Sequence, residues 1–230
     1  MGTRYAVISQ YWLQLRHKRA LRLLAGLLIL FVALAIVARS PGLLHLDREV
    51  SQEVQERHSA PLDFIAYFFT FLGEGVSLTI LCCGVALFLW RTGQKSAAIF
   101  SLLALIGLPL NLLLKLLVQR PRPSADLVRI VITAQGSSFP SGHAMGSVIV
   151  YGFFAYLAWA CLVDVPRRRF WTAVCLTAPV CISLSRIYLG VHWFSDVLGG
   201  WFFGLIVLFL LVDSYNFVKE KRRTARDRAV

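Results

Sequence analysis

Long apolar runs alternate with short polar segments along this chain. Six runs, together with their flanking residues, approach the length of about 20 residues that a helix needs to cross a bilayer. In chain order they cover residues 21–38, 76–90, 97–118, 144–163, 170–184 and 197–212. Because a single apolar run satisfies its backbone hydrogen bonds in lipid only as a helix, the pattern predicts an all-α, six-span integral membrane helical bundle. We expect residues 1–230 to form one domain.

Two stretches between the first and second runs break the simple pattern. The segment "DREVSQEVQERH", from Asp47 to His58, is polar throughout except for two valines. It predicts a short helix that lies on the outer surface rather than crossing the membrane. The aromatic stretch "FIAYFFTFLGEG" then leads into the second run and carries Glu74 near its end.

Positive charge gathers on one side of the predicted bundle. The chain has 24 Lys and Arg against 12 Asp and Glu, a formal net charge of +12. With six spans, one side collects the cations Arg4, Arg16, Lys18, Arg19, Arg22, Arg91, Lys95, Arg167, Arg168, Arg169, Lys219, Lys221, Arg222, Arg223, Arg226 and Arg228. Short cytoplasmic loops retain such residues, so we expect the basic ends, residues 1–20 and 219–230, in the cytoplasm. Charge placed between apolar runs orients spans and does not indicate a nucleic-acid partner.

Further polar residues lie in the three connections on the opposite side, where orientation does not require cations. The motifs there are "KLLVQRPRP" with Lys115 and Arg122, "PSGH" at residues 140–143, and "SRIYLGVHWFSD" with Ser185, Arg186, His192 and Asp196. Arg offers a planar fork and Lys a compact charge to a phosphoryl group. A helix that starts near Ser141 and Gly142 adds free backbone N–H groups. His192 and Asp196 are four apart, so on one helical turn a carboxylate would face and orient an imidazole.

Each of these residues alone has an ordinary structural interpretation. Lys115 would be a snorkelling anchor, Arg122 a loop charge, and His143 an interfacial histidine after a common turn. His192 and Asp196 would be a pair at a helix start. Together they are harder to explain without a function, because polar groups at a membrane face are costly. Glu74 is either a border carboxylate in water or a partner that holds Lys115 or an arginine in place.

The joint spacing of the three motifs resembles the three-part signature of the type 2 phosphatidic acid phosphatase family. The resemblance covers about residues 60–212, and every signature position matches. It implies that His192 is the nucleophile and forms a phosphohistidine, that Asp196 orients it, and that His143 protonates the leaving oxygen and then activates water. The phosphoryl oxygens would be held by Lys115, Arg122, Ser141, Gly142 and Arg186. The family needs no metal and no cofactor.

The cysteines agree with that expectation. All five lie inside apolar runs and none forms a CxxC pair. We therefore expect neither a disulfide framework nor a metal site.

These observations predict a membrane-embedded lipid phosphate phosphatase whose active site faces the outer side. Candidate substrates are undecaprenyl diphosphate, phosphatidylglycerophosphate, phosphatidic acid and diacylglycerol diphosphate. Short loops and the lack of an N-x-S/T acceptor favour a bacterial cytoplasmic membrane.

Three alternatives stay open: a vanadium-dependent haloperoxidase, which is soluble; a lipid binder or translocator without chemistry; and a lipid-to-lipid phosphotransferase. The sequence does not indicate an oligomeric state.

Overall fold

The computed structural model describes the backbone of residues 2–227 and the side chains of residues 18–225. The expected cations Arg4, Arg16 and Arg226 therefore lie outside the described side chains, and Arg228 lies outside the described backbone as well. In the described part every regular element is a helix. In chain order they are α1 (Gly2–Val37), α2 (Pro41–Gln55), α3 (Ala60–Leu72), α4 (Gly75–Arg91), α5 (Lys95–Leu103), η1 (Ala104–Ile106), α6 (Gly107–Val118), α7 (Gly142–Cys161), α8 (Val165–Tyr188) and α9 (Phe194–Asp227).

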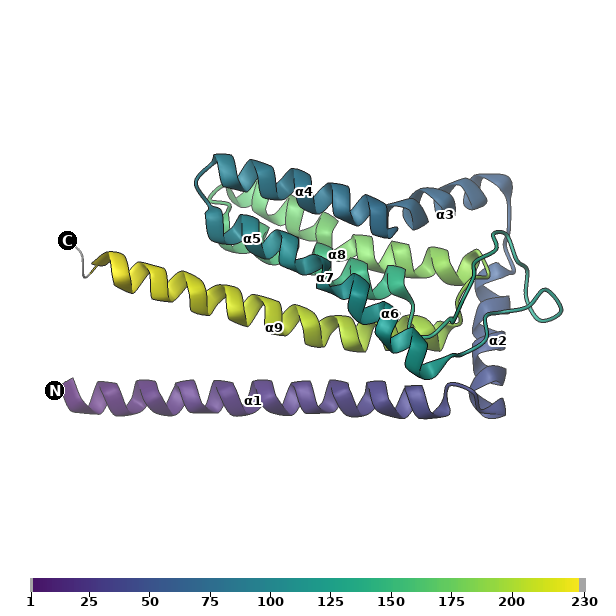
Figure 1. Cartoon of the computed structure of the whole chain (residues 1–230), viewed down its shortest axis with the longest axis horizontal. Coiled ribbons are helices and arrows are strands. Elements are labelled where there is room, and N and C mark those ends of the chain that lie inside the picture. The colour runs from purple at the N-terminus through teal and green to yellow at the C-terminus, as the bar shows by residue number, and fades with distance from the viewer. Residues whose placement is uncertain (1, 228–230) are drawn as a thin grey trace.

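The long helices lie side by side along one axis, and α2 crosses them at one end (Figure 1). Among the described residues, five segments are long and apolar enough to cross a membrane: Lys18–Val37, Lys95–Val118, Gly142–Cys161, Val165–Tyr188 and Phe194–Ala225. The helices α3 and α4, which meet at a bend of 55°, make a sixth segment when they are taken together. The predicted all-helical, six-span membrane bundle is thereby confirmed. Both chain ends lie at the end of the bundle away from α2, as an even number of crossings requires (Figure 1).

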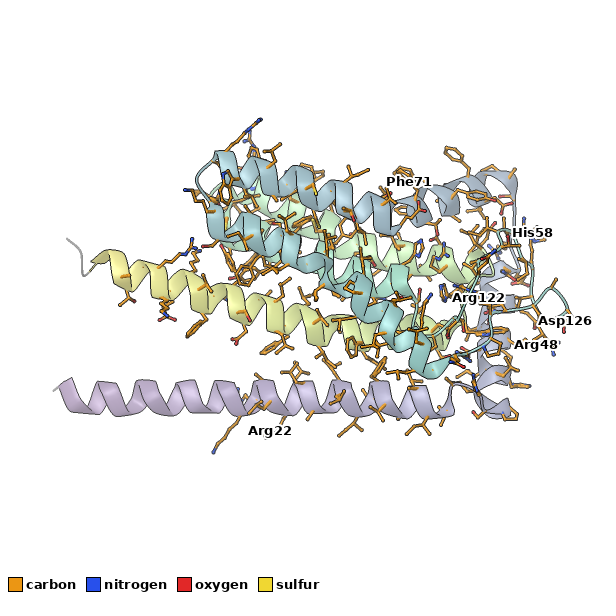
Figure 2. All side chains as sticks on the ribbon, viewed as in Figure 1. Arg22, Arg48, His58, Phe71, Arg122 and Asp126 are labelled. Carbon is orange, nitrogen blue, oxygen red and sulfur yellow. The ribbon has the colours of Figure 1, made fainter. Side chains whose placement is uncertain are left out.

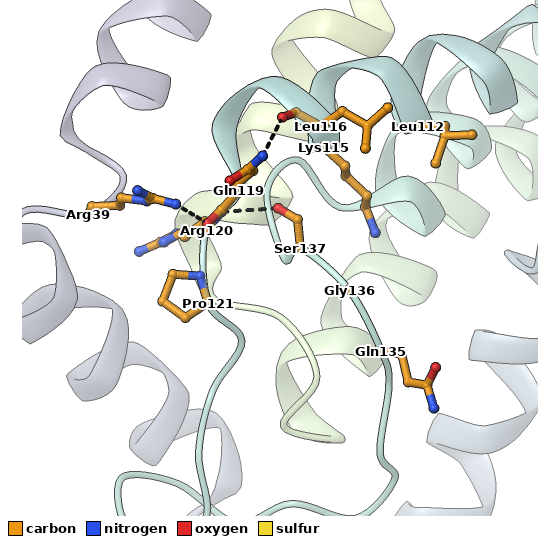
Figure 3. A pocket seen from close by; sticks show the side chains of 10 residues that line it. All are labelled: Arg39, Leu112, Lys115, Leu116, Gln119, Arg120, Pro121, Gln135, Gly136 and Ser137. Carbon is orange, nitrogen blue, oxygen red and sulfur yellow. Dashed lines mark hydrogen bonds between the residues drawn. The ribbon is translucent and has the colours of Figure 1, made fainter.

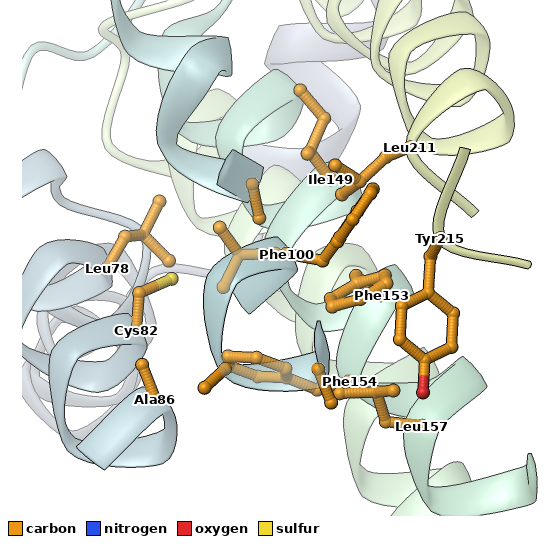
Figure 4. Packing of buried hydrophobic residues seen from close by; sticks show 14 of the residues in the cluster. Leu78, Cys82, Ala86, Phe100, Ile149, Phe153, Phe154, Leu157, Leu211 and Tyr215 are labelled. Atoms are coloured by element: carbon orange, nitrogen blue, oxygen red, sulfur yellow. The ribbon is translucent and has the colours of Figure 1, made fainter. Parts of the chain in front are cut away.

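The core surrounds α7, which is the most deeply buried of the spans. Its residues Ile149 and Phe153 pack against Leu78 of α4, Phe100 of α5 and Tyr215 of α9 (Figure 4). Large apolar side chains on the outer faces of the other helices are exposed, as is expected where lipid rather than water surrounds a protein. The packed α7 therefore gives the "PSGH" turn at its N-terminus a fixed support.

Two predicted spans end too early in the sequence-based assignment. The fifth, predicted over residues 170–184, is the longer helix α8, which begins after Asp164 and includes Ser185 and Arg186 in its last turn. The sixth, predicted to end at residue 212, continues as α9 to Asp227. Apolarity marks only the part of a helix that lies in lipid, whereas its hydrogen bonding continues into the polar region. The predicted connection from Ser185 to Asp196 is correspondingly reduced to the turn between α8 and α9.

The surface helix expected from the polar stretch is present as α2. It begins at Pro41, with Ser40 as its N-cap, and its buried residues are all polar: Asp47, Ser51 and Gln55. The Nε2 of Gln55 donates to the carbonyls of Arg129 at 2.8 Å and Tyr188 at 2.9 Å, and its Oε1 accepts the Arg129 N–H at 3.0 Å. This polar face ties α2 to the end of α8 and to the loop of residues 119–141.

Candidate active site

The residues of the three motifs converge at the end of the bundle that α2 crosses. They come from the end of α6, the following loop, the start of α7, the end of α8 and the start of α9. Arg122 lies at this end, as do Arg48 and His58 (Figure 2). The charges of Lys115, Arg122 and Arg186 all act on His192, which also interacts electrostatically with His143. Residues that are up to 81 positions apart, from Lys115 to Asp196, therefore share one site.

His192 is buried at the centre of this cluster, in the turn between α8 and α9. Its Nε2 lies 3.3 Å from a guanidinium nitrogen of Arg122, and its Nδ1 lies 3.5 Å from Oδ2 of Asp196. Within the described residues, Nδ1 makes no hydrogen bond, and the Asp196 carboxylate faces it from that distance. Catalytic hydrogen bonds are often long in an empty site and shorten when the substrate binds. The arrangement leaves Nε2 as the nitrogen that faces the cations.

The way in which Asp196 reaches His192 differs from the predicted helical pairing. The helix α9 begins only at Phe194, so His192 precedes it and the two residues do not share a helical turn. The carboxylate instead folds back, and its Oδ2 accepts the N–H of Trp193 at 2.9 Å. Asp196 thus stabilises the first turn of α9 and faces the imidazole with the same oxygen.

The surroundings of His192 keep its imidazole neutral. Burial is the largest cause that holds its pKa well below the usual 6.5, and the positive charges of Arg186, Arg122 and Lys115 lower the pKa further. A neutral ring has a free lone pair on one nitrogen. At neutral pH, His192 can therefore act as a nucleophile or a base, and the cations beside it favour an anionic ligand.

The "PSGH" turn is built closely around its small residues. Ser141 is the N-cap of α7: its Oγ accepts the N–H of Ala144 at 3.5 Å, and its own N–H donates to the Asp196 carbonyl at 2.9 Å. Asn111 of α6 donates to the Pro140 carbonyl at 3.1 Å. A Cβ on Gly142 would lie only 2.7 Å from the Asn111 Oδ1, so this position needs glycine.

Each of the three cations is held differently. Arg122 donates to the carbonyls of Gly136 and Gln135, at 3.0 Å each, and Val191 at 2.8 Å. Burial lowers its pKa from the ordinary value. Arg186 donates from one terminal nitrogen to Oγ1 of Thr70 at 2.6 Å, while its buried Nε has no partner among the described atoms. That unpaired N–H is available to a ligand.

Lys115 borders a cavity of about 760 Å³ between α6 and the loop. Its side chain points toward the loop segment of Gly136 (Figure 3). Leu112 and Leu116 line the same cavity and are largely exposed on the lipid-facing surface of α6. The cavity therefore connects a cation of the site with the apolar surroundings of the bundle.

Glu74 lies at the edge of the cluster, at the bend between α3 and α4. Its side chain is exposed and makes no capping hydrogen bond to α4. Its charge nevertheless acts on Arg186. The neighbouring Gly73 packs closely on His143, because a Cβ there would lie 3.3 Å from the imidazole Cδ2. Both interpretations of Glu74 from the sequence remain compatible with this position.

Four residues at the site were not predicted from the sequence. They are Thr70, which binds Arg186, Asn111, which borders Gly142, and the buried pair of Asp47 and Arg120. Arg120 stands inside the quoted first motif, next to the proline before Arg122. The polar residues Asp47, Ser51 and Gln55 recur at every fourth position, a spacing that places them on one helix face.

The described residues contain no group of three or more His, Cys, Asp or Glu side chains that could hold a metal ion. The site instead combines a neutral buried imidazole, a carboxylate behind it, a second histidine and three cations. Such a set suits nucleophilic attack on a phosphoryl group whose oxygens the cations neutralise.

Comparisons with known proteins agree with this chemistry. Residues 94–220 match the family model of the PAP2 superfamily. The chain is 29% identical over 202 residues to phosphatidylglycerophosphatase B of Bacillus subtilis, an alignment that covers 86% of this chain and 97% of that protein. It is 31% identical over 141 residues to the putative undecaprenyl-diphosphatase YbjG of Escherichia coli, covering 59% and 66%. The crystal structure of a PAP2 type phosphatidylglycerolphosphate phosphatase from Bacillus subtilis has the same fold, with a TM-score of 0.72, 24% identity, and coverage of 86% of this chain and 96% of that chain.

Proposed function

This chain belongs to the PAP2 superfamily, and from that premise we propose that it is a membrane phosphatase that hydrolyses the phosphate or diphosphate head group of a lipid. The resemblance that the three motifs predicted is confirmed by the family match over residues 94–220. The proposal rests on the surroundings of His192. This side chain is buried, and its Nε2 lies 3.3 Å from a guanidinium nitrogen of Arg122, among cations that suit a phosphoryl group.

In the first step, Nε2 of His192 attacks the phosphorus atom of the head group. The N–P bond forms as the P–O bond to the leaving oxygen breaks, and His143 gives its proton to that oxygen. Asp196 accepts the Nδ1–H of His192, which orients the ring and stabilises the positive charge that the ring gains. Lys115, Arg122, Arg186 and the N–H groups at Ser141 and Gly142 hold the phosphoryl oxygens.

In the second step, water hydrolyses the phosphohistidine. The oxygen of the water attacks the phosphorus atom while His143, now neutral, removes a proton from that water. The N–P bond breaks, which restores His192. Inorganic phosphate leaves the site. No metal ion takes part in this scheme, because the charge on the phosphoryl oxygens is balanced by Lys115, Arg122 and Arg186.

The substrate class follows from where the site lies. The catalytic residues are at one end of the spanning helices, and the cavity at Lys115 is continuous with the exposed leucines of α6. This suits a molecule with an anionic head and an apolar tail. The curated relatives named above are a phosphatidylglycerophosphatase and a putative undecaprenyl-diphosphatase. We propose these two lipid phosphates, with phosphatidic acid and diacylglycerol diphosphate, as the substrates to test.

The test is phosphate release by purified protein from each of these lipids, with EDTA present throughout. We expect release from at least one lipid and none from His192→Ala, which removes the nucleophile without interrupting a span. Release by His192→Ala at the wild-type rate would contradict the mechanism, and release that EDTA abolishes would contradict metal independence. Loss of the lipid phosphate without inorganic phosphate, upon addition of a second lipid, would indicate a phosphotransferase.

Orientation is tested separately by labelling with a membrane-impermeant thiol reagent. In a background without the five native cysteines, Ser124→Cys should react in intact cells because it lies in the loop at the catalytic end. Thr92→Cys, between α4 and α5 at the opposite end, should react only after permeabilisation. The reverse pattern would place the site in the cytoplasm and contradict an outer-face phosphatase of the bacterial cytoplasmic membrane.

A further inference from the structure

Three buried charges form a cluster behind the proposed nucleophile. One terminal nitrogen of Arg120 donates a hydrogen bond to Oδ1 of Asp196 at 2.6 Å, and the other donates one to Oδ2 of Asp47, also at 2.6 Å. The side chains are 2% exposed for Arg120 and 0% exposed for both aspartates. One almost fully buried cation therefore stands between two buried carboxylates.

Both oxygens of the Asp47 carboxylate accept hydrogen bonds within this cluster. Besides Arg120, it accepts the N–H of Ser195 at 2.8 Å on Oδ1 and the hydroxyl of Ser195 at 2.6 Å on Oδ2. The same hydroxyl oxygen accepts a hydrogen bond from Arg120 at 2.7 Å. Asp47 is thus tied both to the arginine and to the residue directly before Asp196 in the chain.

The cluster determines which way Asp196 faces. Its Oδ1 is bound by Arg120, and its Oδ2 accepts the N–H of Trp193 and faces Nδ1 of His192. With one oxygen fixed on each side, the carboxylate cannot rotate without breaking a buried charged hydrogen bond, which is costly. The orientation of the imidazole therefore depends on where Arg120 holds Asp196, and the position of Arg120 depends on Asp47.

The cluster also determines the net charge that lies behind His192. When Arg120 is shared by two carboxylates, the three groups together carry one net negative charge. That charge faces an imidazole that becomes positive when it takes up the phosphoryl group. If Asp47 were neutral, Arg120 would balance Asp196 alone, and the developing positive charge would lose much of its stabilisation.

From these contacts we propose that Asp47 and Arg120 are positioning residues for phosphoryl transfer, which hold Asp196 in place and leave its negative charge available to His192. The inference rests on the proposed function, since it assigns a role toward the same nucleophile. It also assigns a role to α2, which lies outside the residues 94–220 that match the family. The surface helix thus completes the catalytic site from outside that region.

The experiment compares Asp47→Asn with Asp63→Asn in the purified full-length chain. Asp63 binds Arg129 of the same loop at 2.7 and 2.9 Å but makes no described contact with His192 or Asp196, so it is a matched control. Asp47→Asn should lower kcat roughly 10- to 100-fold, the usual loss when a reacting group is slightly misplaced. Its KM should stay within about threefold of wild type, because the phosphate-binding cations are unchanged. Asp63→Asn should leave both constants close to wild type.

A double-mutant cycle on kcat, with folded protein counted by size-exclusion chromatography, separates positioning from mere structural support. In an Arg120→Gln background, adding Asp47→Asn should cost little further activity, because Asp47 acts through Arg120. Asp47→Glu keeps the charge and should retain at least ten times the kcat of Asp47→Asn. Equal kcat for these two variants would overturn the assignment, and this comparison holds even where the yield of folded protein falls.

Three further outcomes would overturn the positioning role of Asp47 and Arg120. The first is wild-type kcat in Asp47→Asn while His192→Ala is inactive, which leaves the proposed function intact. The others are a change in KM alone in Asp47→Asn, and an equal fall of kcat in Asp63→Asn. Full activity of His192→Ala instead contradicts the proposed function itself, so the two failures are distinguishable.

Discussion

Two arginine–aspartate contacts lie at the end of the molecule that α2 crosses, and they differ in their burial and in the further residues that they bind. In both, an arginine of the loop after α6 binds an aspartate of a helix near the N-terminus. The Arg120 and Asp47 side chains are 2% and 0% exposed, and Arg120 also binds Asp196. Arg129 and Asp63 are 34% and 22% exposed and hold the loop against α3. Both pairs have a further partner, because Asp63 also accepts the hydroxyl of Tyr188 at 2.7 Å and Arg120 also binds Asp196 at 2.6 Å. The two pairs therefore differ in burial and in whether that further partner belongs to the proposed catalytic site.

The largest expected effect comes from neutralising the carboxylate at the inner end of the buried cluster. Asp196→Asn should lower turnover roughly 10⁴-fold, the loss seen where the carboxylate behind a catalytic histidine becomes an amide. The matched change at the partly buried pair, Asp63→Asn, should have little effect on turnover. Phosphate release at saturating lipid checks both. Comparable losses in the two variants would remove the distinction between the pairs.

The next largest effect is on stability. Arg120→Met leaves two buried carboxylates without their shared cation and should lower the free energy of unfolding by about 3–5 kcal/mol. Arg129→Met should lower it much less, because its partner stays in contact with water. Unfolding by SDS in mixed micelles, followed by tryptophan fluorescence, measures the difference. If Arg129→Met proved the more destabilising change, burial would not be the deciding factor.

A smaller effect is expected in the pH profile. The pKa of His192 is held well below 6.5 by burial and nearby cations, so its neutral form persists to acidic pH and is lost only as the pH falls through that low value. Arg122→Gln removes one of these cations, which should raise the pKa and move the acid limb of kcat/KM to higher pH. The control Arg129→Gln should leave the limb in place. An acid limb that stays put or moves to lower pH in Arg122→Gln would contradict this electrostatic account.

The smallest effect concerns Glu74, at the border of the site. Its charge acts on Arg186, but its side chain is exposed, so water screens the interaction. Glu74→Gln should raise KM at most about threefold and leave kcat unchanged, as expected for an exposed charge of low energetic weight. Steady-state kinetics at low and moderate salt checks this. A fall in kcat of more than tenfold would show that Glu74 holds a cation in the catalytic position.

Much of this arrangement was predictable because its signals are local. Apolar runs predict spans, and the motif residues stand at fixed spacings within short segments, so they could be identified before they were placed in space. The roles assigned to them by resemblance remain predictions. Helix limits were less accurate where polar residues such as Arg186 and Asp213 continue a helix beyond its apolar part.

The partners of Arg120 could not be predicted in the same way. Asp47 is 73 residues away from it, and no local pattern specifies which distant carboxylate an arginine will meet. The recurrence of polar residues at every fourth position in α2 indicated a polar face, but such a face usually points to water. Here it is buried, because backbone carbonyls and Arg120 at the ends of the spans provide hydrogen-bond partners. The predicted helical pairing of His192 with Asp196 was wrong for a related reason, since the contact arises from a turn.

The central claim is that His192 carries the phosphoryl group during turnover. The most direct measurement uses a lipid diphosphate labelled with ³²P on its terminal phosphate, mixed with His143→Ala protein and quenched with base after short times. The lipid phosphate that leaves from a diphosphate needs little protonation, so transfer to His192 should continue slowly without His143, whereas hydrolysis loses the residue that activates water. The intermediate should therefore accumulate, and an acid-labile, base-stable label should map to the peptide that contains His192. We expect label on His192 and none in a His143→Ala/His192→Ala double variant. Label on another residue, or phosphate release that proceeds at an undiminished rate in the double variant, would contradict it.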